Sequence, residues 1–231
     1  MDPVAFIALW AALFVGTHIL ISSTLMRPWL VALVGEQPYR GIYSLVSFAT
    51  FVPLVIVFAH HEHSGTLWWG LRADAPVRWL AWLMMLIAFI MLVSGLVTPS
   101  PASIGSPAGS LQAPHGLLKI TRHPSFVAFA LFGIAHMLMN GWSGDLIFFG
   151  TFPILGIVGG RHQDARKLRD LGEPYRKFVE QTSFFPGAAL ISGRQTWTAA
   201  DVPWVGIAVG IGLTIVTVLV HPMLFGGTPL G

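Results

Sequence analysis

Six apolar segments with almost no charge dominate this sequence of 231 residues. A helix that crosses a bilayer needs about 20 predominantly apolar residues. Only 10% of the residues in this chain are charged, whereas soluble domains carry about 25%. The candidate segments are 3–21, 41–59, 78–97, 124–140, 145–159 and 203–224, of which 124–140 and 145–159 are short for a span. The sequence therefore predicts an all-α fold: a polytopic membrane helix bundle with about six transmembrane helices, forming one domain over residues 1–231.

The basic residues predict how the bundle is oriented. If the six segments cross in succession, 11 of the 13 Lys and Arg residues lie on one side, and only Arg72 and Arg78 lie on the other. Cytoplasmic loops carry the excess of Lys and Arg, so both termini are expected outside. The first segment lacks a basic flank and a cleavage site and is expected to be a retained span. We expect a multi-pass membrane protein.

Two connections are long, and two spans contain proline. Residues 98–113 are rich in Pro, Gly and Ser and predict an irregular loop. Residues 160–201 alternate charged and apolar side chains and predict a cytoplasmic amphipathic segment, broken in two at Gly172 and Pro174. Pro53 is expected to kink its span, and Pro153 is expected to interrupt the span 145–159.

Two histidines lie inside apolar spans and are the leading candidates for a functional site. The chain has no cysteine and nine histidines, so imidazole is the strongest metal ligand available. An ionisable residue within a membrane span predicts function, although His18 and His136 could each simply hydrogen-bond within the bundle. Together they favour a shared ligand, a haem b held by two imidazoles, and Gly133 would let a flat ring approach its helix. Helix rise places the two at depths about 10 Å apart, and by depth His123 is the fallback partner for His18.

Other polar residues allow weaker hypotheses. Arg122 and Lys119, which His115 and His123 flank, could anchor a haem propionate or a phosphate at the inner interface, or could be snorkelling cations. The cluster His60, His61 and His63 could bind zinc or copper, although a solvated loop is favoured. The remaining candidates, His162 and His221, are interpreted as structural.

Three motifs carry a resemblance to a known family: VGTHILISS, KITRHPSFVAFALFGIAHMLMNG and GEPYRKFVEQTSFFP. In these motifs the chain resembles the NnrU family, which includes bacterial proteins linked to nitrite and nitric oxide metabolism and also 15-cis-zeta-carotene isomerase. The resemblance implies a membrane-embedded b-type haem with one ligand at His18, in VGTH, and the other at His136, in GIAH. It also implies a role in activity for a histidine within His60–His63.

Several functions remain open at this stage. The first is a haem b protein of nitrogen-oxide or redox physiology that binds nitric oxide, and the resemblance to the bacterial members then implies a bacterial inner (plasma) membrane. The second is a haem-dependent isomerase of zeta-carotene or a similar lipophilic polyene. A more distant resemblance to isoprenylcysteine carboxyl methyltransferases, in RHP, LGEPYRKFV and FFP, implies an S-adenosylmethionine-dependent methyltransferase, although GGRHQDARKLRDLG lacks the paired glutamates of that family. A structural protein without a cofactor is the fourth. The expected partners are membrane lipid and a small lipophilic molecule, and not nucleic acid.

Overall fold

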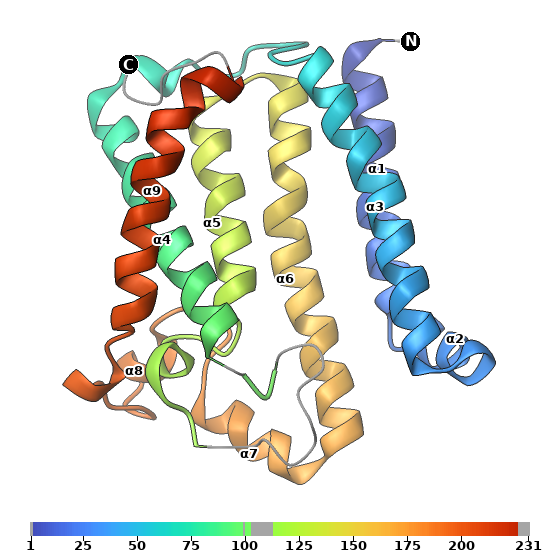
Figure 1. Cartoon of the computed structure of the whole chain (residues 1–231), viewed down its shortest axis with the longest axis vertical. Coiled ribbons are helices and arrows are strands. Elements are labelled where there is room, and N and C mark those ends of the chain that lie inside the picture. Colours follow the sequence, from blue (N-terminus) through green and yellow to red (C-terminus); the bar gives the residue numbers. More distant parts are fainter. Residues whose placement is uncertain (1, 99, 103–112, 226–231) are drawn as a thin grey trace.

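The residues that the structure describes form a helix bundle. The computed structural model describes residues 2–98, 100–102 and 113–225, and within them the only extended pairing is an isolated bridge between Leu67 and Trp142. Five helices are long and apolar enough to cross a membrane, and they are α1 (Pro3–Ser22), α3 (Glu36–His60), α4 (Ala75–Val97), α6 (Ser143–Leu171) and α9 (Trp204–Phe225). The apolar helix α5 (Pro124–Met139) is shorter, at 16 residues, and runs alongside them (Figure 1). The predicted all-α polytopic bundle is confirmed.

One end of the bundle carries most of the short elements and most of the basic residues. The helices α2 (Met26–Val34), α7 (Glu173–Gln181) and α8 (Ala188–Ile191) all lie at this end, which we call the basic end (Figure 1). The short turns η2 (Gly116–Lys119) and η3 (Ala199–Asp201) join it, whereas η1 (Leu71–Ala73) lies at the opposite end with the start of α1. The positive-inside rule still predicts that the basic end is cytoplasmic.

Helix α6 extends further than its sequence suggested. Pro153 was expected to interrupt this span, but α6 runs unbroken from Ser143 to Leu171, as neighbouring helices allow for prolines within membranes. Residues 160–171 are therefore the last turns of α6, and the prediction that they begin a separate surface segment is wrong. The predicted break is confirmed at Gly172, which has φ 62°. Of the predicted loop 98–113, residues 99 and 103–112 lie outside the described part of the chain.

Gly133 lets α5 pack directly against α6. A Cβ atom at this position would lie 2.5 Å from the carbonyl oxygen of Phe149 and 2.6 Å from Cδ of Pro153. Proline has no N–H to give to that carbonyl, so the glycine backbone approaches an oxygen that lacks its usual helical donor. The expectation that Gly133 would face a flat cofactor ring is wrong, because the backbone of α6 occupies that space.

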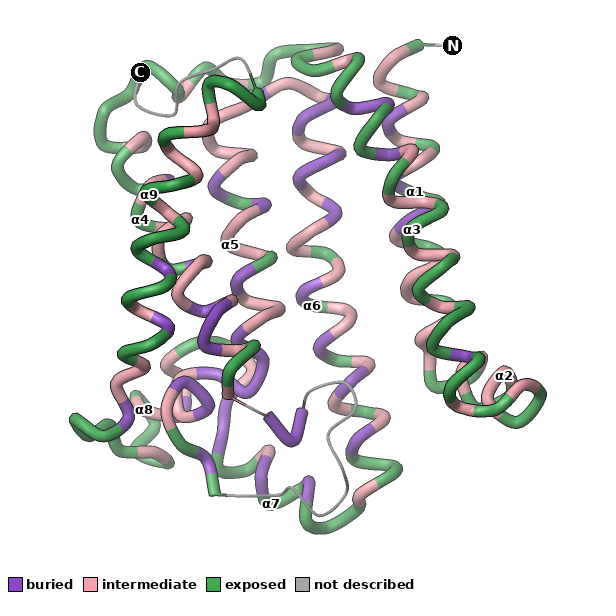
Figure 2. Tube along the Cα trace, in the orientation of Figure 1, coloured by how far each residue is buried: buried purple, intermediate pink, exposed green. Residues whose placement is uncertain are grey.

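Burial divides the bundle into a tight end and an open end. Far from the basic end, α1 and α3 pack on α6 through a core that includes Ile7, Phe14, Leu54, Phe58 and Phe148. Towards the basic end, α1 and α3 lean away from α6 (Figure 1). Buried residues are frequent on α6, whereas α3 and α9 are largely exposed (Figure 2), as expected for helices that face lipid. The divergence of the helices leaves a cleft at the basic end.

Candidate functional site

The cleft lies between α1 and α3 on one side and α5 and α6 on the other. Its volume is about 880 Å³, which is within the range of small-molecule sites. On α3 its lining changes from Phe51 and Phe48 to Tyr43 and then to Arg40 and Glu36 as the helix approaches the basic end.

The facing side of α6 changes in the same direction. Its lining side chains begin with Phe152 and Leu155, pass His162 and Gln163, and reach Arg166. These positions recur at helical spacing and therefore form one face of α6. The cleft is thus aromatic in the bundle interior and basic at its mouth.

His18 lies where the aromatic and the polar parts of the cleft meet. Its Nε2 is 2.6 Å from the hydroxyl of Tyr43, and its Nδ1 is 3.2 Å from Oγ of Ser47. The Ser47 hydroxyl donates its proton to the carbonyl oxygen of Tyr43, at 2.8 Å, so its oxygen is left to accept. Nδ1 of His18 therefore carries the hydrogen, and the lone pair on Nε2 accepts from Tyr43. A neutral imidazole with Nδ1–H held by a neighbour and Nε2 free to bind is a form that ligates metals.

A second imidazole lines the same cleft, and the sequence did not indicate it. His162, on α6, has a buried Nδ1 atom without a hydrogen-bond partner among the described residues. In the sequence, this histidine lies in the stretch RHQDARK and is interpreted as structural. The signal was its spacing, since His162 is one helical turn before Arg166 and shares its face.

His136 lies in a different environment from His18. Its Nδ1 donates to the carbonyl oxygen of Phe132 at 2.8 Å, and its ring stacks on Phe149 with the centroids 4.6 Å apart. It does not line the cleft. The structure therefore does not bring the two predicted haem ligands to one cavity.

Phenylalanine rings fill the interior between the two histidines. Four rings form a row in which each contacts the next, in the order Phe14, Phe51, Phe152 and Phe132. The distances between successive ring centroids are 4.9, 6.5 and 4.8 Å. Phe14 lies 5.5 Å from the ring of His18, and Phe132 lies 4.2 Å from that of His136. A haem that both histidines ligate would have to displace part of this row.

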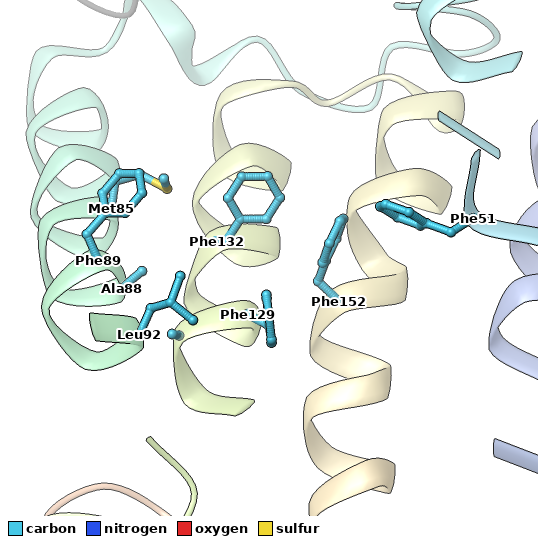
Figure 3. A pocket seen from close by; sticks show the side chains of 9 residues that line it. Phe51, Met85, Ala88, Phe89, Leu92, Phe129, Phe132 and Phe152 are labelled. Carbon is cyan, nitrogen blue, oxygen red and sulfur yellow. The ribbon is translucent and has the colours of Figure 1, made fainter. Parts of the chain in front are cut away.

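A smaller apolar cavity adjoins the cleft. It measures about 280 Å³ and shares Phe51, Phe129 and Phe152 with the cleft. Figure 3 shows that it extends from these rings towards Met85 and Leu92 of α4, and all the described side chains that line it are apolar. The two spaces together offer a largely hydrocarbon surface across α3, α5, α6 and α4.

Arg122 and His123 were predicted to bind a cofactor, and the structure gives them other partners. Asp164 of α6 accepts from Arg122 at 2.6 and 2.9 Å, from Nε2 of His123 at 2.8 Å and from the hydroxyl of Tyr175 at 2.7 Å. Burial and the negative charge of Asp164 raise the pKa of Tyr175 well above its usual range, so it remains a neutral donor. This network joins the start of α5 to α6 and α7, and neither Arg122 nor His123 lines the cleft. The predicted propionate-binding role has no support in this geometry, because both side chains are already paired.

Lys119 and the histidine cluster at residues 60–63 are the two remaining predicted sites. Lys119 has another partner, and the cluster has too few metal ligands. Lys119 donates to Asp201 at 2.8 Å instead of facing the cleft. His63 lies 3.2 Å from the buried Asp145, and His60 bonds to its own helix at the carbonyl oxygen of Ile56. Among the described residues no group of three or more His, Asp and Glu side chains gathers to bind a metal.

Comparison with known proteins gives matches over most of the chain. A family model described as NnrU protein matches residues 6–229. Two curated proteins, each named 15-cis-zeta-carotene isomerase, chloroplastic, are 27% identical over 204 residues in Zea mays and 25% identical over 208 residues in Arabidopsis thaliana. The alignments cover 83% and 85% of this chain and 53% and 54% of the relatives, so the chain spans about half the length of these relatives. No solved structure matches this chain.

Proposed function

The chain belongs to the NnrU protein family, and from that premise we propose that it is a multi-pass membrane protein that isomerises a long polyene, zeta-carotene or a similar molecule. The observation that carries the proposal is the aromatic cleft, which holds His18 at its polar boundary and continues into a cavity lined only by apolar side chains. The names of the two curated relatives supply the substrate class.

The cleft suits a hydrocarbon that arrives through the lipid. Phe48 and Phe129, which line it, are 65% and 44% exposed on the flank of the bundle. A carotene has no group that needs a hydrogen bond, so aromatic and aliphatic walls bind it by burial alone. Phe51, Phe129 and Phe152 form the passage from the cleft to the cavity beside α4.

Haem b is the cofactor we propose for this site, and His18 fits it as a ligand. Its Nε2 lone pair faces the cleft side of α3 and is occupied by a single hydroxyl, that of Tyr43. His136, which the family resemblance assigns as second ligand, also keeps an unprotonated Nε2, because its Nδ1 donates to Phe132. When bound, the haem would supply a redox-active iron beside the polyene. The protein contributes the orientation of the imidazole, through Ser47 at Nδ1, and an aromatic wall beside it.

The experiment is to supply 9,15,9′-tri-cis-zeta-carotene to the reduced, haem-replete protein in lipid nanodiscs. Chromatography of the extracted carotene is expected to show loss of the 15-cis isomer, and His18→Ala is expected to abolish it. An Ala88→Phe variant fills the apolar cavity and leaves His18 untouched, so it is expected to slow conversion without changing the haem spectrum. An unchanged isomer profile in wild-type protein with an intact haem spectrum contradicts the proposal.

The other predicted functions rank below the isomerase. Nitrogen-oxide physiology and a bacterial inner membrane stay predictions, and the named relatives are chloroplastic carotene isomerases. The methyltransferase alternative required the RHP motif to hold S-adenosylmethionine. Here Arg122 and His123 are paired with Asp164 inside the protein, which argues against that alternative.

A further inference from the structure

The mouth of the cleft carries more positive than negative charge. Four cations line it against two carboxylates, and these residues are Arg27, Arg40, Arg166, Lys167, Glu36 and Asp170. Arg27 and Arg40 share one of the two carboxylates, Glu36, at 2.8 and 3.1 Å. The lining of the mouth therefore has a net positive charge.

Arg166 is the lining cation best placed to bind an anion that enters the cleft. It is half-buried on the cleft face of α6, and it makes no hydrogen bond or ion pair with any residue that the structure describes. A guanidinium in a partly desolvated position is costly unless it is paired. Its planar fork matches the two oxygens of a carboxylate or a phosphate.

The rest of the cleft indicates what the anion is attached to. Phe152 lies 14 residues before Arg166 on the same face of α6, about 21 Å away along the helix axis. The wall between them changes from aromatic to polar, and the facing side of α3 changes in the same direction. The cleft therefore complements a molecule with a long apolar body and an anionic head at one end.

We propose that the mouth of the cleft binds the anionic oxygen group, carboxylate or phosphate, of an amphiphile whose apolar body lies along the phenylalanine wall, and that Arg166 is its main partner. Two sources carry this chemistry. One is the propionate pair of a haem held at His18, which rests on the proposed function. The other is the phosphate of an anionic membrane phospholipid, which does not.

The experiment compares Arg166→Gln with Arg161→Gln, a matched control on the same helix whose side chain is exposed and does not line the cleft. In one arm, ferric haem b and its dimethyl ester are titrated into protein in phosphatidylcholine nanodiscs, and the Soret band gives both affinities. In the other arm, delipidated protein is offered phosphatidylglycerol and phosphatidylcholine in native mass spectrometry. Wild type and Arg161→Gln are expected to prefer the free-acid haem, or the anionic lipid, by about tenfold, as for a charge-assisted hydrogen bond.

Loss of that preference in Arg166→Gln supports the proposal, and the arm in which it is lost identifies the source. A wild-type protein that binds no haem contradicts the proposed cofactor but leaves the lipid arm as a full test. The proposal is overturned if Arg166→Gln retains the wild-type preference in both arms. If the glutamine variant does not fold, Arg166→Met replaces it. That variant keeps an apolar side chain of similar length and loses the charge, and an unchanged preference there also overturns the proposal.

Discussion

The hydroxyl of Tyr43 lies 2.6 Å from Nε2 of His18, so the nitrogen that we propose for haem ligation already has a partner. Ser47 fixes the opposite nitrogen as the protonated one. The hydrogen bond between Tyr43 and His18 connects α3 to α1 at the boundary between the aromatic and the basic parts of the cleft. Any ligand that bonds to Nε2 must first replace the Tyr43 hydroxyl.

The first prediction concerns this competition. Tyr43→Phe removes the hydroxyl and keeps the ring, so haem no longer has to displace a hydrogen bond worth about 1 kcal/mol, and binding is expected to tighten by up to about fivefold. Tyr39→Phe is the control, because the Tyr39 hydroxyl donates to the carbonyl oxygen of Ile21 and not to His18. A haem titration followed at the Soret band measures the haem affinity of both variants. Weaker haem binding by Tyr43→Phe would contradict the prediction, because the Tyr43 hydroxyl would then stabilise the haem-bound state instead of competing with haem for Nε2 of His18.

The second prediction concerns the ligands themselves. His18→Ala is expected to remove or strongly shift the Soret band of the purified protein, and His136→Ala is expected to convert a low-spin spectrum to a high-spin one, as the family resemblance implies. His162→Ala is the discriminating variant, because His162 lines the cleft with His18 and has an unpaired Nδ1. A spin-state change in His162→Ala but not in His136→Ala would move the second ligand to α6. Protein that stays colourless with ample haem would refute haem binding altogether.

The third prediction concerns the network around Asp164. Asp164→Asn leaves Arg122, which is 9% exposed, without its carboxylate, and breaking a buried ion pair costs about 3 kcal/mol or more. The variant is expected to lower the thermal unfolding midpoint in detergent while the haem spectrum of the folded fraction stays the same. Glu173→Gln is the control, because Glu173 does not line the cleft and its pair with Arg176, whose side chains are 59% and 64% exposed, is worth less than about 1 kcal/mol. A shifted haem spectrum in Asp164→Asn would place Arg122 and His123 in the binding site after all.

Much of the fold could be predicted from the sequence, and less of the site. Apolar length predicts the spans because a bilayer fixes how many residues a helix needs, and the break at Gly172 follows from backbone freedom. Pro153 misled the prediction of α6 because the penalty of proline depends on the neighbouring helix, here the close approach of Gly133. Asp164 and His162 lie in one charged stretch. Which of them faces a buried arginine and which faces a cleft depends on how α6 is rotated against α5 and α3, and no local pattern encodes that rotation.

The fourth prediction concerns pH and the loop that carries Asp201. Burial alone would raise the pKa of this carboxyl, but hydrogen bonds from Lys119, Thr198 and Gly116 outweigh it and hold the pKa well below its usual range. The carboxylate therefore stabilises the folded protein above the ordinary aspartate pKa of about 3.9, and the stabilisation is lost as the pH falls through the lower folded value. The difference in free energy of unfolding between wild type and Asp201→Asn is expected to be constant from pH 7 to 5 and to narrow below about pH 4. A difference in free energy of unfolding that stays constant down to pH 3 would show that protonation of Asp201 does not control this part of the stability.

The fifth prediction tests whether α5 and α6 owe their close contact to Gly133. In Gly133→Ala the added methyl would lie 2.5 Å from the carbonyl oxygen of Phe149, a backbone atom that can move only if the two helices separate. Overpacking of this kind costs about 1–3 kcal/mol, so the unfolding midpoint is expected to fall. Gly150→Ala on α6 is the matched control, since nothing lies within 4 Å of its added Cβ, and alanine there is expected to be neutral or to stabilise the helix by up to about 1 kcal/mol. Because His136 is one turn beyond Gly133 and stacks on Phe149, the separation is also expected to alter the haem spectrum if His136 is a ligand. Destabilisation with an unchanged spectrum would confirm the packing role and argue against His136 as the second ligand.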